Sequence, residues 1–341
     1  MGGTGSRPLF NFWAVAAHLC GPSSSPGPYS LMIESGTSTT VESTTEVLDQ
    51  IDARRRSRMA DYVELTKPRL TMLSVLTTLA GYWVGAIGPL DPMHIVNTLI
   101  GTFLVGGGCG ALNMYVEREH DVLMRRTMTR PLPAGRLRPS DALIFGSVIS
   151  IVGLAWLALT VNLLTAALGL ATLVSYVFLY TPLKRRSTLN TVVGAIPGAL
   201  PPVMGWAAAR GALGPEAIVL FGILFFWQMP HFLALAWMYR RDYERAGYKM
   251  LTVLDPDGGS TSRQILLYTA ALLPISLIPT LFGIAGGFYF FGALAIGLGF
   301  LAFGAVLAVS RKNVHAKWLF YYSLLYLPVL LLTMVIDRGS A

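Results

Sequence analysis

The sequence predicts an all-α polytopic membrane protein, a bundle of nine transmembrane helices with a cytoplasmic N-terminus and an exterior C-terminus. Three observations lead to this fold class. Of the 341 residues, 53% are hydrophobic and 13% are charged, whereas a soluble domain has roughly 25% charged residues. Apolar windows long enough to cross a bilayer recur along the chain, and basic residues gather in alternate loops. A soluble globular fold is therefore excluded.

Residues 1–57 are rich in Ser, Thr, Gly and Pro and contain no apolar run long enough to span a membrane. Because such a composition cannot bury a core, we expect a disordered leader, followed by a membrane domain over residues 58–341. The run at 10–20 resembles a short signal-peptide core, but the acidic residues that follow it argue against a mitochondrial transit peptide. A true start at Met59 would explain the leader equally well.

Nine mostly apolar windows follow Lys67, each of about the length that a membrane-spanning helix needs. Their expected limits are 70–87, 93–115, 141–160, 163–180, 190–209, 216–238, 264–284, 289–309 and 317–336. An odd number of spans places the two ends of this domain on opposite sides of the bilayer.

The basic residues predict the orientation of these helices. Twenty-three Lys and Arg residues lie between residue 54 and the first window or after the second, fourth, sixth and eighth, and the opposite loops hold only Arg210 and Arg338. Cytoplasmic loops accumulate Lys and Arg, so this arrangement predicts the N-terminus inside. The net charge of +8 suggests an anionic lipid surface or an anionic substrate rather than nucleic acid. Cys20 and Cys109 support neither a disulfide framework nor a cysteine metal site.

The first segment that carries chemistry begins at the cytoplasmic end of the second window. Asn113, Glu117 and Asp121 are spaced four residues apart, and each step of four turns a helix only about 40° past a full turn, so the three side chains share one face. Oxygen ligands of this kind suit Mg²⁺, which takes one or two carboxylates together with phosphate oxygens. Spacing alone fits equally well a solvated helix end with ion pairs to Arg118 or Arg125.

The residues that follow favour a metal and phosphate site over that alternative. Arg125, Arg126 and Arg130 come directly after the acidic residues. Guanidinium groups bind phosphate oxygens in a planar, bidentate manner. A metal-binding face and an arginine cluster are therefore presented together, as phosphate binding requires.

A second cytoplasmic segment places Lys184, Arg185 and Arg186 before a helix entrance that offers Ser187, Thr188 and Asn190. Three cations with hydroxyl groups and free helix-start N–H groups suit a phosphate-rich anion. Taken alone, the segment is more often an ordinary basic loop that sets topology.

A third segment places Trp227, Gln228 and His231 within an apolar helix that runs on to Asp242. Polar groups at membrane depth are costly and tend to be functional. His231 could contact a substrate, and a histidine that is simply hydrogen-bonded to a neighbouring helix is an equal alternative.

Four ordered motifs together carry a resemblance to a known family. They are Asn113-x-x-x-Glu117-x-x-x-Asp121, Met124-x-Arg126-Thr127-x-x-Arg130-Pro131, YTPLKRRSTLN, and WQMPHFLALAW with Arg241-Asp242-Tyr243. Over about residues 60–340 the chain resembles the UbiA-type intramembrane prenyltransferases, in particular their haem O synthase branch, the protohaem IX farnesyltransferases.

The resemblance implies a function. Members are nine-helix bundles of the membrane that transfer the farnesyl group of farnesyl diphosphate to a vinyl group of haem B, with hydration, to give haem O for terminal respiratory oxidases. It implies a bacterial plasma (inner) membrane location, an active site on the cytoplasmic side, Mg²⁺ as cofactor, and haem A synthase or terminal oxidase assembly factors as partners.

The resemblance also implies roles for individual residues. Asn113, Glu117 and Asp121 would hold the metal. The leaving diphosphate would be neutralised by Arg126, Arg130, Lys184 and Arg185, and Asp242 would complete the metal site or orient the diphosphate. Trp227, His231 and Tyr180 are candidates for contact with the flat haem face.

Three departures from the family pattern concern the same motifs. Glu117 stands where most bacterial members of the wider family have Asp, which keeps the charge on a longer arm. The second acidic motif retains only Asp242, because position 246 is Ala246. The resemblance therefore implies a second Mg²⁺ less strongly than the first. The usual Ile-Pro-Met-Leu-Pro-Val run is replaced by residues 248–253, which leaves the path of that loop open.

Two other functions fit parts of the sequence. Prenyl transfer to a different aromatic acceptor, such as a quinone precursor, would use the same scaffold, but the WQMPHF segment favours haem. A transporter or anion channel would also have many helices and a basic face. Transporters place polar residues near the bilayer midplane on broken helices, whereas the ionisable residues here crowd one membrane face.

Overall fold

The computed structural model describes residues 58–338 of the chain, so the expected leader at 1–57 lies outside the described residues. Within this range the chain forms helices and no strands. The nine long helices begin and end as follows: α4 Pro68–Gly85, α5 Pro92–Asp121, α6 Pro139–Thr160, α7 Leu163–Val174 with its continuations η1 Ser175–Tyr180 and α8 Thr181–Leu183, α9 Asn190–Arg210, α10 Pro215–Met238, α13 Gly259–Leu281, α14 Gly287–Ser310 and α15 Asn313–Ile336. Three short helices are α3 Arg58–Leu65, α11 Arg240–Arg245 and α12 Leu251–Leu254.

Eight of these helical segments are long and apolar enough to cross a membrane, which makes the chain a multi-pass membrane protein. The first predicted window corresponds to α4, which is not one of the eight; it begins with Pro68 and Arg69 and contains several hydroxyl residues. Thr71, Thr77 and Thr78 of α4 donate hydrogen bonds to backbone carbonyls shortly before them in the chain. Their hydroxyl groups are thus satisfied within the chain, which lowers the cost of placing them in lipid.

Local signals set several helix ends. Asp91 accepts hydrogen bonds from the backbone N–H groups of Met93 and His94, and Pro92 occupies the first position of α5. Asn162 caps α7 through Thr165, at a distance of 2.8 Å. This cap separates α6 from α7 at 160–163, where the sequence predicts the boundary.

Close helix contacts are made through glycines. A Cβ atom added to Gly205 of α9 would lie 1.9 Å from the backbone oxygen of Thr78, and one added to Gly81 of α4 would lie 2.0 Å from the backbone oxygen of Pro202. Small residues let helix backbones approach closely in membranes. The packing of α4 against α9 therefore depends on these two glycines.

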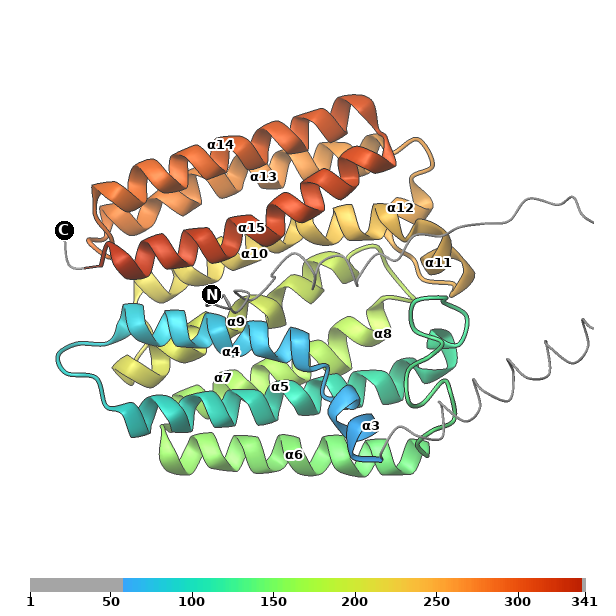
Figure 1. The fold of residues 1–341 in the computed structure, drawn as a ribbon, viewed down its shortest axis with the longest axis horizontal. Coiled ribbons are helices and arrows are strands. Elements are labelled where there is room, and N and C mark those ends of the chain that lie inside the picture. The colour runs from blue at the N-terminus through green and yellow to red at the C-terminus, as the bar shows by residue number, and fades with distance from the viewer. Residues whose placement is uncertain (1–57, 339–341) are drawn as a thin grey trace, which may run out of the picture. The chain divides into compact units, whose positions relative to one another are not determined.

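The polar connections gather at one end of the bundle. In Figure 1, α3, α11, α12 and the loop that follows α5 lie at the same end, and α15 finishes at the opposite end. At that opposite end, Arg338 donates hydrogen bonds to the carbonyls of Trp83 and Ala86, and Arg210 donates one to Gly85. The first and last long helices of the described chain are thereby joined where α4 ends.

Candidate active site

The last turns of α5 present Asn113, Glu117 and Asp121 on one buried face. Their exposed fractions are 0%, 6% and 0%. The helix continues to Asp121, beyond the predicted window of 93–115, so all three residues belong to one regular helix. The expectation that the three side chains share a helical face is confirmed.

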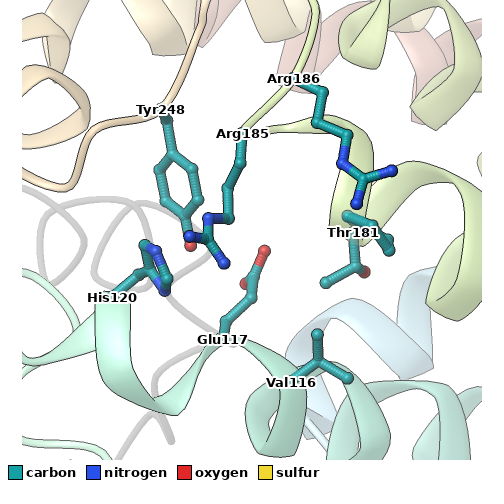
Figure 2. Close-up of a pocket in the computed structure, with 8 residues that line it drawn as sticks. Val116, Glu117, His120, Thr181, Arg185, Arg186 and Tyr248 are labelled. Atoms are coloured by element: carbon teal, nitrogen blue, oxygen red, sulfur yellow. The ribbon is translucent and has the colours of Figure 1, made fainter.

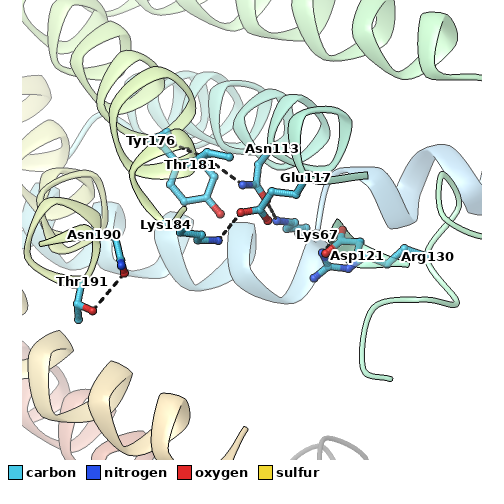
Figure 3. Close-up of polar contacts among 10 residues, drawn as sticks. All are labelled: Lys67, Asn113, Glu117, Asp121, Arg130, Tyr176, Thr181, Lys184, Asn190 and Thr191. Atoms are coloured by element: carbon cyan, nitrogen blue, oxygen red, sulfur yellow. Dashed lines mark hydrogen bonds and ion pairs between the residues drawn. The ribbon is translucent and has the colours of Figure 1, made fainter. Parts of the chain in front are cut away.

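Each of these three side chains is bonded to a cation from another segment (Figure 3). Lys67 Nζ donates to Asn113 Oδ1. Lys184 Nζ lies 2.6 Å from Glu117 Oε1, and Arg130 Nη1 lies 2.7 Å from Asp121 Oδ2. Glu117 therefore pairs with a distant segment and Asp121 with the loop that follows α5, so the alternative of ion pairs to Arg118 or Arg125 is wrong.

Lys67 is a site residue that the motifs did not indicate. It lies between α3 and α4 with φ of 50°, a left-handed conformation that is uncommon outside glycine. Burial, together with the positive charges of Arg130 and Lys184, lowers the pKa of its amine to about 7, although the Glu117 carboxylate acts in the opposite direction. The residue is 46 positions from Asn113 in the chain, so no local pattern could have revealed the contact.

The pKa of Lys184 is shifted in the opposite direction from that of Lys67. Burial disfavours its charged form, but the Glu117 carboxylate beside it raises its pKa well above the usual value. The amine also lies 4.5 Å from the ring centre of Tyr180 and 5.8 Å from that of Tyr248. Lys184 is thus a permanent positive charge that faces aromatic rings and one carboxylate.

The amide of Asn113 is oriented by its neighbours. Its Nδ2 donates to Thr181 Oγ1 at 2.9 Å, and the Thr181 hydroxyl donates to the carbonyl of Tyr176 at 2.8 Å. Because Nδ2 is used in this way, Oδ1 is the atom turned toward Lys67 and the acidic face. An amide oxygen is therefore available as a metal ligand.

The carboxylate of Asp121 has one oxygen that a bound cation would satisfy. Its Oδ2 accepts from Arg130, but its Oδ1 is buried and has no hydrogen-bond partner among the described residues. A buried carboxylate oxygen without a partner is costly, and a hard divalent cation would satisfy it. No group of three His, Cys, Asp or Glu residues suited to a metal occurs among residues 58–338, so a metal here would also need the Asn113 oxygen and substrate oxygens.

A pocket of about 310 Å³ opens beside the acidic face (Figure 2). Glu117, expected to hold the metal, and Arg185, expected to bind the diphosphate, both line this pocket. The full lining is Val116, Glu117, His120, Thr181, Pro182, Arg185, Arg186 and Tyr248. The rings of His120 and Tyr248 stack with their centres 5.6 Å apart, and no motif indicated either residue.

The loop over residues 248–253, whose path the sequence leaves open, is tied to the basic loop that carries Lys184. The backbone N–H of Lys249 donates to the carbonyl of Lys184 at 2.8 Å. Asn190 Nδ2 donates to the carbonyls of Lys249 and Ser187, at 3.0 and 2.6 Å. Asn190, which the sequence places among groups for an anion, thus holds the two loops together.

The remaining candidates belong to four segments: Arg126 follows α5, Asp242 is in α11, Trp227 and His231 are in α10, and Tyr180 is in η1. The guanidinium of Arg126 lies 5.3 Å from the ring centre of Tyr239, and Asp242 of α11 pairs with Arg245. Trp227 and His231 lie against α15, where the Trp227 indole N–H donates to the carbonyl of Ser323. Tyr180 lies beside Lys184, and its expected contact with haem stays a prediction, as do those of Trp227 and His231.

Residues 74–327 match the UbiA prenyltransferase family. The chain is 50% identical over 289 residues to protoheme IX farnesyltransferase of Solibacter usitatus, which covers 82% of this chain and 99% of that protein. It is 45% identical over 294 residues to protoheme IX farnesyltransferase of Koribacter versatilis, which covers 83% of this chain and 94% of that protein.

Solved structures share the fold at low sequence identity. A digeranylgeranylglyceryl phosphate synthase structure has a TM-score of 0.69 at 15% identity and covers 83% of this chain and 99% of that one. A UbiA homologue of Archaeoglobus fulgidus bound to GPP and Mg²⁺ has a TM-score of 0.57 at 17% identity and covers 80% of this chain and 99% of that one. These likenesses concern the fold alone.

Proposed function

Because the chain belongs to the UbiA prenyltransferase family, we propose that it transfers the farnesyl group of farnesyl diphosphate to a vinyl group of haem B, with hydration, to make haem O for terminal respiratory oxidases. Relatives that carry the name protoheme IX farnesyltransferase align over nearly their whole length at 45–50% identity. The observation that carries the proposal is the buried face of Asn113, Glu117 and Asp121, with a cation bonded to each.

The acidic face would hold Mg²⁺ through Asn113, Glu117 and Asp121. The unpartnered Oδ1 of Asp121 supports this ligand set, and a UbiA homologue has been solved with Mg²⁺ bound. When bound, Mg²⁺ stabilises negative charge on the diphosphate oxygens as a Lewis acid. Asp242 would complete this site or orient the diphosphate, once it is released from Arg245.

The cations around this face would bind and neutralise the leaving diphosphate. With Lys67 protonated, Lys67, Arg130 and Lys184 outnumber the two carboxylates by one positive charge, and Arg185 adds another in the adjoining pocket. Arg126 would add a further guanidinium. Fixed positive charges of this kind stabilise the charge that develops as the allylic C–O bond breaks and its electron pair leaves with the diphosphate.

The apolar interior of the bundle would keep water from the allylic cation until the haem vinyl carbon attacks it. The new carbon–carbon bond leaves a cation on the former vinyl group, which takes up water and releases a proton. Trp227, His231 and Tyr180 are our candidates for contact with the haem plane.

We further propose nine transmembrane helices, with α4 as the first, in the bacterial plasma membrane. The gathering of basic loops at the end of the bundle that carries the acidic face supports a cytoplasmic active site and a cytoplasmic N-terminal side. Residues 58–341 would form the catalytic domain. Haem A synthase or terminal oxidase assembly factors are the partners we propose, because they would consume the haem O.

The test is an assay of the acceptor. Purified protein is incubated with farnesyl diphosphate, Mg²⁺ and either haem B or a quinone precursor, and the products are analysed by mass. We expect haem B to gain one farnesyl group and one hydroxyl group, and the quinone precursor to be recovered unchanged. Prenylation of the quinone precursor with haem B left intact would contradict the proposal.

A further inference from the structure

His231 is held in a cluster of rings and hydroxyl groups between α10 and α15. The centre of its ring lies 5.1 Å from that of Trp227 and 4.8 Å from that of Phe320, and both pairs are stacked. Trp227, Phe320 and Ser323 are buried, with exposed fractions of 5%, 6% and 0%. His231 is the member of this cluster that stays partly exposed.

The hydrogen bonds determine which nitrogen of His231 carries the proton. Its Nδ1 lies 2.7 Å from Ser323 Oγ, and that hydroxyl lies 2.5 Å from the carbonyl oxygen of Phe320. A carbonyl can only accept, and a serine has a single proton to give. Both contacts are satisfied together only when Ser323 donates to Phe320 and Nδ1 of His231 donates to Ser323.

This assignment leaves Nε2 as a bare lone pair. Among residues 58–338 Nε2 has no hydrogen-bond partner, and it is not one of the fully enclosed polar atoms. A neutral imidazole with one N–H fixed by a neighbour and the other nitrogen open is the form in which histidine binds metal ions. The arrangement therefore presents a ready ligand atom.

The position of His231 fits a substrate that reaches the acidic site. Ala236, five residues further along α10, belongs to the same buried cluster as Met124 and Tyr248, and Tyr248 lines the pocket beside Glu117. Five residues of helix correspond to about 8 Å. His231 thus lies about that far along α10 from the residues beside the pocket, on the side toward the interior of the bundle.

We propose that Nε2 of His231 is an axial ligand to the iron of the substrate haem, and that Ser323 is a positioning residue that fixes the tautomer and the ring orientation of His231. The identity of the ligand as haem rests on the proposed function. Trp227 and Phe320 would keep the imidazole plane in place by stacking.

The test is haem binding by the purified full-length protein, followed by absorption and electron paramagnetic resonance spectra without farnesyl diphosphate. Wild-type protein is expected to give a histidine-ligated spectrum, His231→Ala to lose it, and added imidazole to restore it. Ser323→Ala should weaken haem binding about 10- to 100-fold, as loss of an outer partner of a metal-bound histidine does. Ser323→Thr keeps the hydroxyl and should retain wild-type affinity.

Ser276→Ala is the matched control. Ser276 is also buried and bonds across helices, to the Tyr326 hydroxyl at 2.7 Å, but it does not contact His231. Its loss should leave haem affinity and spectrum unchanged. If Ser276→Ala weakens binding as much as Ser323→Ala, the positioning role of Ser323 is refuted.

A wild-type spectrum in His231→Ala overturns the inference, and formation of farnesylated haem by the wild-type protein would still uphold the proposed function. Conversely, a histidine-ligated spectrum that depends on His231, in a protein that never farnesylates haem B, upholds the ligand and refutes the function. The two failures are thus distinguished by separate readouts.

Discussion

Glu117 and Lys184 form a buried ion pair, with side chains 7% and 13% exposed. Loss of one partner leaves the other charge buried and unpaired, which costs about 3–5 kcal/mol, whereas loss of both is far less harmful. We expect Lys184→Met to lower thermal stability strongly and the double variant Glu117→Gln/Lys184→Met to recover most of it. Thermal unfolding of the purified variants measures this.

Activity measurements should distinguish the stabilising role of this ion pair from its proposed role in binding the metal and the diphosphate. Because Glu117 and Lys184 would also bind the metal and the diphosphate, the double variant should stay inactive although it is stable. Wild-type turnover in the stable double variant would show that the pair is purely structural.

A substitution of Arg126 tests whether diphosphate binding depends on the shape of the guanidinium group or only on its positive charge. Arg126→Lys keeps the positive charge but loses the planar fork and the contact with the ring of Tyr239. If Arg126 binds diphosphate, the variant should raise KM for farnesyl diphosphate or lower kcat about tenfold or more. Arg138→Lys, whose side chain is 82% exposed and pairs with Asp141, is the control and should have wild-type kinetics. Equal kinetics in both variants would limit Arg126 to a role in topology.

Only part of the site could be predicted at the residue scale. Asn113, Glu117 and Asp121 repeat every four residues, so their common face follows from helix geometry alone. Lys67 and Tyr248 reach the site through the fold, and the ring of Tyr248 stacks on that of His120 in the pocket lining. These contacts join distant segments, and no local spacing reports such contacts.

At the scale of elements, the packing of α4 on α9 depends on a glycine contact. Gly205→Ala would force its new methyl group into the backbone of Thr78, and overpacking of this kind costs about 1–3 kcal/mol or more. We expect a lower thermal midpoint for Gly205→Ala. Gly222→Ala is the control, since its methyl group would meet only the Ile275 side chain at an ordinary 3.4 Å. Equal stability of the two variants would contradict this account of the packing.

The lengths of the helices follow the sequence. The window at 190–209 corresponds to Asn190–Arg210. Helix α5 continues past its apolar window, which ends at 115, to Asp121, as the shared helical face of Asn113, Glu117 and Asp121 requires. The π-helical turn at Ser175–Tyr180 had no signal in the sequence.

For the whole molecule, composition and periodicity predict a helical membrane protein, and the structure confirms that class with eight candidate spans among the described residues. They do not predict which helices are neighbours, because close packing depends on small residues far apart in the chain, such as Gly81 and Gly205. The count of nine spans and the orientation stay predictions.

Reporter fusions test the orientation. A reporter after Ala341 should report the exterior, and one inserted near Arg186 should report the cytoplasm, because basic loops are retained inside. The control is a third reporter inserted after Gly211, in the loop that follows Arg210 at the α15 end of the bundle, which should match the C-terminal one. The reverse pattern would overturn the topology, and reporters at Arg186 and Ala341 on the same side would mean an even number of spans between them.

In the proposed reaction, the acidic face of α5 cleaves farnesyl diphosphate with a divalent metal, and the farnesyl group is delivered to haem. The most direct measurement follows diphosphate release and haem mass in one reaction, for wild-type protein and for Asp121→Asn. We predict one diphosphate released per haem O formed by the wild-type protein, loss of both products in Asp121→Asn and with EDTA, and recovery when Mg²⁺ is restored to the wild-type protein. Wild-type rates in Asp121→Asn, or indifference to chelation, would contradict the claim.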